Sequence, residues 1–167
     1  MSIVERDFYC EEIHPIDIVE TLAEERSWDF DRIADDQIAM AIEGSWRTYS
    51  VTLARSPHEE SLRLICAIEM KPPAKRMSAF YRAIALANDR CWSGGFTLWR
   101  EQGLMAYRYA LNLAGGAAAS SDQINDMVRA AVHASERFYP AFQLVAWGGE
   151  KPELALGIAM TEAYGRA

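Results

Sequence analysis

The stretch LRLICAIEM, residues 62–70, contains the clearest structural pattern in the chain. Every second residue in it is apolar, namely Leu62, Leu64, Cys66, Ile68 and Met70. Successive side chains of a β-strand point to opposite faces of the sheet. The spacing therefore predicts a strand with one buried face and one face exposed to solvent.

The segments before this strand continue the same alternation. Apolar residues recur at every second position in residues 38–42 and again in residues 49–53. Residues 28–33 indicate a short earlier strand, and residues 34–36 are typical of a turn. Because the loops between these segments are of hairpin length, we expect an antiparallel meander.

Helical spacing appears on both sides of the predicted meander. Residues 14–26 place a proline in the first turn and carry an apolar stripe, which predicts a first helix. Pro72-Pro73 interrupts the sheet, and residues 77–91 then carry apolar side chains three and four positions apart. We expect this second helix to end near Trp92, with Gly94-Gly95 as its C-terminal cap.

A second hairpin is expected after these glycines. Residues 96–101 and 104–113 flank a tight turn at Gln102-Gly103. Apolar residues lie on both faces of this hairpin, so that each face has something to bury. One face can pack against helices, and the other needs a cover supplied by a second copy of the chain or by a client protein.

The C-terminal segment is predicted to be helical. Residues 124–145 repeat apolar residues at intervals of three and four. Either Ser120 with Gln123, or the neighbouring pair at residues 121–122, is the expected N-terminal cap. A last helix is expected from Pro152 to about residue 164.

The predicted order is an N-terminal helix, an antiparallel meander, a helix, a hairpin and C-terminal helices, which is an α+β fold. At 167 residues the chain is long enough for one hydrophobic core. We expect one domain over residues 1–167, with residues 1–13 as an N-terminal extension.

Composition and charge argue against several classes of partner. The formal net charge is −7, which opposes binding to nucleic acid and to anionic membrane surfaces. The N-terminus lacks the basic start and apolar run of a signal peptide, and no apolar stretch is long enough to span a membrane. We therefore expect a cytoplasmic protein that binds neither nucleic acid nor membranes.

The residues capable of catalysis form no recognisable pattern. Cys91 lies at the C-terminal end of a predicted helix, where the helix dipole disfavours a reactive thiolate. His14, His58 and His133 lack the spacing of a metal site. The loop at residues 114–122 lacks the glycine and lysine pattern of a phosphate-binding loop. We expect a protein that is not an enzyme and holds neither cofactor nor metal.

Aromatic residues of the second hairpin are the best candidates for partner binding. Trp99, Tyr107 and Tyr109 lie in its two strands, and aromatic side chains dominate the energetics of many protein interfaces. The expected partners are a second copy of the chain, forming a homodimer, and a protein client. The acidic surface favours a basic or amphipathic client segment.

Four stretches resemble the YbjN family of bacterial proteins. They are HPIDIVETLAEERSWDFDRIADDQIAMAIEGSWRTYSVTL (14–53), LRLICAIEM (62–70), ERFYPAFQLVAWGG (136–149) and EAYGRA (162–167). The resemblance implies a compact α+β fold similar to type III secretion chaperones, often dimeric, and a role in regulating sensory transduction. The family supplies no catalytic motif, so no site residue follows from the resemblance.

Two functions therefore stay open. The first is a non-enzymatic module that binds a protein partner in a regulatory or chaperone-like way. The alternative is a small-molecule-binding protein or an enzyme, with a pocket between the sheet and the long C-terminal helix. Pro140 lies within that helix and is expected to bend it. A pocket with convergent polar groups would favour the alternative.

Overall fold

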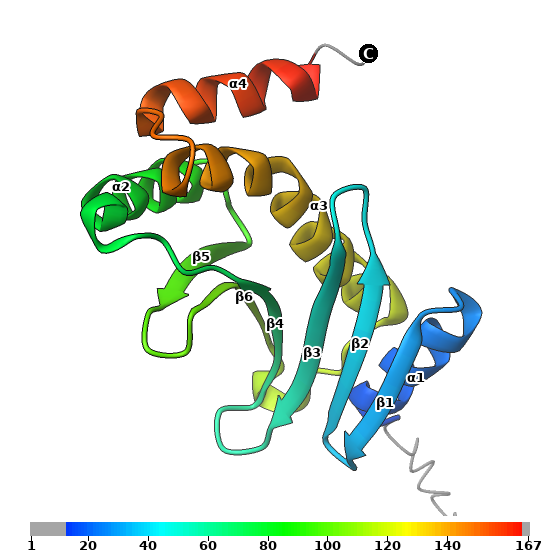
Figure 1. Ribbon diagram of the computed structural model, residues 1–167. Coiled ribbons are helices and arrows are strands. Elements are labelled where there is room, and N and C mark those ends of the chain that lie inside the picture. The colour runs from blue at the N-terminus through cyan, green and yellow to red at the C-terminus, as the bar shows by residue number, and fades with distance from the viewer. Residues whose placement is uncertain (1–12, 165–167) are drawn as a thin grey trace, which may run out of the picture.

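An antiparallel sheet of six strands forms the body of the protein, with helices on one of its sides and across one end (Figure 1). This computed structural model describes residues 13–164. Except for Ile13, the predicted N-terminal extension lies outside the described residues, as do Cys10 and the end of the EAYGRA stretch.

The elements follow the predicted order. The strands are β1 (Asp29–Ala34), β2 (Gln37–Glu43), β3 (Thr48–Ser56), β4 (Ser61–Glu69), β5 (Gly94–Trp99) and β6 (Leu104–Asn112). The helices are α1 (Pro15–Glu25), α2 (Met77–Asn88), α3 (Ser121–Ala146) and α4 (Pro152–Tyr164), with short 3-10 turns at Ala74–Arg76 and Ala114–Gly116. The α+β class and the order of helix, meander, helix, hairpin and helices are confirmed.

The LRLICAIEM segment is the strand on which the two parts of the sheet meet. The strand order is β1-β2-β3-β4-β6-β5, and each neighbouring pair is antiparallel. The meander thus ends at β4, and the second hairpin continues the same sheet because β6 pairs with β4. Cys66 of β4 lies opposite Val51 on one side and Tyr107 on the other.

One face of the sheet forms the core. We call the face that carries Met40, Val51, Cys66 and Tyr107 the inner face and the opposite one the outer face. Helices α1 and α3 pack on the inner face (Figure 1). The predicted apolar stripe of α3 is buried there, comprising Ile124, Val128, Ala131, Ser135, Phe138, Phe142 and Val145.

A cluster of aromatic rings joins the hairpin to the helices. The ring of Phe96, on edge strand β5, lies 5.3 Å from Tyr107, 5.9 Å from Phe138 and 5.2 Å from Phe142, measured between ring centroids. Phe142 in turn lies 5.6 Å from Phe80 of α2. The cluster thus holds β5, β6, α2 and α3 together.

The end of α2 differs from the prediction. The helix stops at Asn88, and Gly94-Gly95 begin β5 instead of capping the helix. The side chain of Asn88 accepts a hydrogen bond from the Phe96 amide at 2.7 Å and donates one to its carbonyl at 3.0 Å, so it takes the place of a neighbouring strand. Glycine is required at position 94 because a Cβ there would lie 2.5 Å from the carbonyl oxygen of Arg108.

The C-terminal helices pack within the chain. Ser120 and Gln123 form the capping box of α3, which was one of the two caps expected. Helix α3 continues on both sides of Pro140. Helix α4 lies across α2 and the end of α3, away from the rest of the sheet (Figure 1), and buries Ala155 and Leu156.

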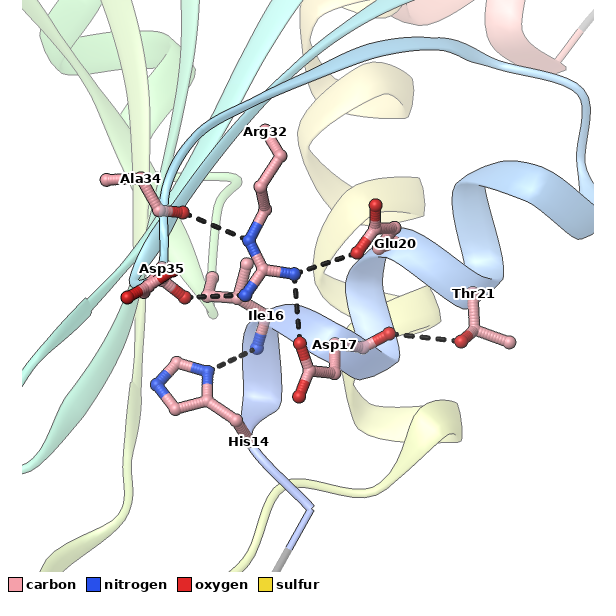
Figure 2. Close-up of polar contacts among 8 residues, drawn as sticks. All are labelled: His14, Ile16, Asp17, Glu20, Thr21, Arg32, Ala34 and Asp35. Atoms are coloured by element: carbon pink, nitrogen blue, oxygen red, sulfur yellow. Dashed lines mark hydrogen bonds and ion pairs between the residues drawn. The ribbon is translucent and has the colours of Figure 1, made fainter.

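Arg32 attaches α1 to edge strand β1. Its guanidinium group donates to the carboxylates of Asp17 at 2.9 Å and Glu20 at 2.8 Å, both on α1 (Figure 2). It also donates to the backbone carbonyls of Ala34 at 3.0 Å and Asp35 at 2.6 Å. The guanidinium therefore joins the helix to the turn that follows β1.

Glu136 attaches α3 to the turn between β2 and β3. Its carboxylate accepts hydrogen bonds from the buried hydroxyl of Tyr49 at 2.6 Å and from the amides of Ser45 at 3.0 Å and Trp46 at 3.3 Å. Burial alone would raise the pKa of Glu136, but these hydrogen bonds outweigh it and lower the pKa below its usual value.

Replacement of Glu136 by Gln should reduce stability in a pH-dependent way. A carboxyl group whose pKa is lower in the folded than in the unfolded state stabilises the fold above its unfolded-state pKa, and that contribution disappears as the pH falls through the folded-state pKa. We expect Glu136→Gln to lower the free energy of unfolding by about 1–2 kcal/mol at neutral pH. The difference from the unmodified protein should shrink below about pH 4.

Urea unfolding between pH 3 and pH 8 measures this difference. Glu43→Gln is the matched control, because Glu43 is an exposed carboxylate on β2 whose side chain makes no hydrogen bond or ion pair with a described residue. A difference for Glu136→Gln that is unchanged at acid pH would contradict the assigned charge interaction.

Candidate functional site

The outer face of the sheet is much less buried than the inner face. On β3, Tyr49 and Val51 are fully buried on the inner face, whereas Thr48 and Ser50 on the outer face are exposed. In Figure 1 the helices lie on one side of strands β1 to β4. Within residues 13–164, then, no helix covers this part of the outer face, which is available for a partner.

A groove opens on this face beside the second hairpin. Its lining residues are Glu59, Arg63, Leu64, Ile65, Trp99, Arg108, Tyr109 and Ala110, and we call it the Trp99 groove. Its volume is about 490 Å³. It combines the indole ring of Trp99 and the apolar side chain of Ile65 with the guanidinium groups of Arg63 and Arg108.

The three predicted partner-binding residues do not share one surface. Trp99 and Tyr109 both border the Trp99 groove. Tyr107 is 3 % exposed and packs edge-on against Phe96 on the inner face. Tyr109 has the same strand parity as Tyr107, so its position also points toward the helices. Trp99 is therefore the predicted residue best placed for direct contact with a partner.

A second cavity, of about 330 Å³, lies between the β5–β6 turn and the segment that joins β4 to α2. Met70, Met77 and Leu98 give it an apolar lining, and the charged residues Lys71, Arg100 and Glu101 also border it. Sequence reasoning missed this cavity because its lining comes from two segments, residues 70–77 and 98–103, that are distant along the chain. Pro72 of the predicted Pro72-Pro73 break borders the cavity.

Among the described residues, no set of three or more His, Cys, Asp and Glu side chains could hold a metal ion. No described helix has the length and apolar character needed to cross a membrane.

The two described cysteines are held as thiols. Cys66 is fully buried, and this burial raises its pKa to about 11, although a contact of 3.5 Å with the hydroxyl of Ser135 works in the other direction. Cys91 lies three residues beyond the end of α2 and is partly buried, which raises its pKa despite the nearby charge of Arg137. Neither position favours a thiolate nucleophile at neutral pH.

A sequence model of the YbjN family, described as "Putative bacterial sensory transduction regulator", matches residues 15–144. The chain belongs to the YbjN family. The match covers every strand, α1, α2 and most of α3. No curated protein sequence matches the chain.

Two solved structures are similar in fold. The crystal structure of YbjN from E. coli is 8 % identical, covers 90 % of this chain and 93 % of its own chain, and has a TM-score of 0.50. The structure of the HopA1–SchA chaperone–effector complex contains a chain that is 15 % identical, covers 71 % of this chain and 87 % of its own, and also has a TM-score of 0.50. The chaperone-like α+β fold implied by the YbjN resemblance is confirmed.

Alkylation of the cysteines tests the assignment of unreactive thiols. In a Cys10→Ser background, we expect iodoacetamide at pH 7.5 to modify Cys91 several-fold more slowly in the folded than in the urea-unfolded protein, because the folded thiol has a raised pKa. Cys66 should be protected more strongly, since it is fully buried. Mass spectrometry of tryptic peptides gives both rates. Faster labelling of Cys91 in the folded state would identify it as an activated thiol.

Proposed function

We propose that this YbjN-family protein is a non-enzymatic, chaperone-like regulatory module that binds a segment of a partner protein on its outer sheet face. The observation that carries the proposal is the Trp99 groove on a face that no described helix covers. The family description as a regulator and the fold shared with a chaperone–effector complex support the same reading. The proposed location is the cytoplasm.

Trp99 is the proposed anchor for the partner. Its side chain is partly exposed on an edge strand, where further burial by a partner is possible. A tryptophan offers roughly 150–250 Å² of surface for burial. Truncation of such an anchor commonly costs about 2 kcal/mol or more of binding free energy.

The charged neighbours of Trp99 select the chemistry of the bound segment. Arg63 forms an ion pair with Glu59, and Arg108 is exposed without an ion pair to any described carboxylate. The preferred segment therefore places an apolar side chain beside Trp99 and a carboxylate near Arg108. The net charge of −7 acts at longer range and favours basic residues farther from the groove.

A second copy of the chain is the competing occupant of the same face. The outer face is rich in small side chains, including Ala41, Ser50 and Ala110. Small side chains permit close approach of another sheet or helix. The homodimer expected from the sequence is therefore also a proposal. The experiment that detects a client on this face also detects a second copy of the chain.

Photo-crosslinking from position 99 tests the proposal. Trp99 is replaced by the photoreactive residue p-benzoylphenylalanine in the cell of origin, and the crosslinked peptides are mapped by mass spectrometry. We expect a defined peptide of another protein that contains an apolar residue next to an acidic one. The affinity of the purified protein for a synthetic copy of that peptide is then measured, and Trp99→Ala should weaken it by roughly thirtyfold.

The matched control carries the photoreactive residue at Trp46, which is 56 % exposed in the β2–β3 turn, away from the groove. Crosslinks from position 99 to a second copy alone would assign the face to the homodimer and reject the client. The same crosslinks from both positions, or none from position 99, would reject the outer face as a binding surface.

A further inference from the structure

A third cavity lies between the sheet and α3, which is where the alternative hypothesis from the sequence expected a pocket. Its volume is about 200 Å³, and its lining comes from β6, from α3 and from the loop between α2 and β5. The residues that surround it include Arg90, Trp92, Ser93, Tyr107, His133 and Arg137. We call it the Arg137 cavity.

The Arg137 cavity is positively charged in a protein that is acidic overall. Arg90, His133 and Arg137 line it, and none of its lining residues is acidic. No ion pair joins these three side chains to a described carboxylate. Among the described residues, the Arg90 side chain hydrogen-bonds only the carbonyl of Leu86, in helix α2, which ends two residues before Arg90. The cavity therefore has two guanidinium charges, those of Arg90 and Arg137, that no described carboxylate pairs with.

Arg137 also has an unsatisfied hydrogen-bond donor. Its Nε atom is buried and has no partner in the structure. The guanidinium carbon lies 5.2 Å from the centroid of the Phe138 ring, and its Nη2 atom contacts the sulfur of Met160, a weak acceptor. Because the Nε atom is covered by protein, a ligand in the cavity would bond instead to Nη1, which makes no hydrogen bond to a described residue and is not buried.

We propose that the Arg137 cavity binds the phosphate group of a nucleoside monophosphate. Planar guanidinium groups donate two hydrogen bonds to one phosphate, and two of them border this cavity together with His133. The volume accommodates a phosphate and part of a sugar but not a base, so the base lies outside the cavity.

Trp92 supplies the surface for the base. Its side chain is 98 % exposed at the cavity margin, although a tryptophan normally buries most of its surface. An aromatic base can stack on an exposed indole ring without any sequence-specific hydrogen bond. This site is independent of the Trp99 groove, because Trp99 does not line the cavity and points to the outer face.

Isothermal titration of the full chain with adenosine monophosphate tests the proposal, with adenosine and inorganic phosphate as separate arms. We expect saturable binding of the monophosphate, and binding at least about tenfold weaker for adenosine, which lacks the charged group. Inorganic phosphate should compete with the monophosphate but bind less tightly, because it cannot stack on Trp92. Equal affinity for adenosine and the monophosphate would overturn the proposal.

Three substitutions separate the parts of the site. Arg137→Gln should weaken binding of the monophosphate by roughly tenfold or more, as loss of a charged donor requires. Arg90→Gln, at an exposed position, tests the same charge in case Arg137→Gln impairs folding. Trp92→Ala should weaken binding of the monophosphate by at least about fivefold while leaving that of inorganic phosphate unchanged.

Arg26→Gln is the matched control, because Arg26 is an exposed arginine at the end of α1 whose side chain, within residues 13–164, bonds only to Asn125. It changes the net charge equally and should alter affinity by less than about twofold. An equal loss with Arg26→Gln, or no saturable binding of the monophosphate to the unmodified protein, would reject the site. Circular dichroism confirms that each variant is folded.

Discussion

The packing of Phe96 is the interaction on which both proposed sites depend. Its ring joins edge strand β5 to β6 and α3, and its backbone is bonded by the side chain of Asn88 at the end of α2. The loop between α2 and β5 is therefore held at both ends, which places Trp92 at the margin of the Arg137 cavity. Trp99 lies three residues beyond Phe96, and because strand side chains alternate, it faces the opposite side of the sheet.

This arrangement gives one hairpin two different surfaces. The inner side of β6 meets α3 and borders a small cavity with two arginines, whereas the outer side borders a wider groove with the partly exposed indole ring of Trp99. The proposed anionic ligand and the proposed protein segment would thus lie on opposite sides of β6. The two proposed sites would give this YbjN-family chain separate places for a ligand and for a partner.

Two charged side chains attach α1 and α3 to the strands of the meander. Arg32 joins α1 to β1, and Glu136 joins α3 to the β2–β3 turn. Both groups make several hydrogen bonds to backbone atoms as well as to side chains, so they fix orientation in addition to adding Coulombic attraction. The apolar stripe of α3 is buried against the inner face, and Glu136 fixes which turn the helix lies against.

The alternation of LRLICAIEM and the helical spacing of residues 124–145 were sufficient to predict the strand, the long helix and the α+β order, because periodicity records which side of an element is buried. The sequence did not reveal that β6 pairs with β4, that α2 ends at Asn88, or that Arg90 and Arg137 share a cavity. Nor did it reveal that Tyr107 is buried on the inner face while Trp99 lies on the outer face. These features depend on contacts between segments far apart in the chain, and local periodicity determines only how a residue faces within its own element. Tertiary packing alone decided which elements, and therefore which side chains, came together.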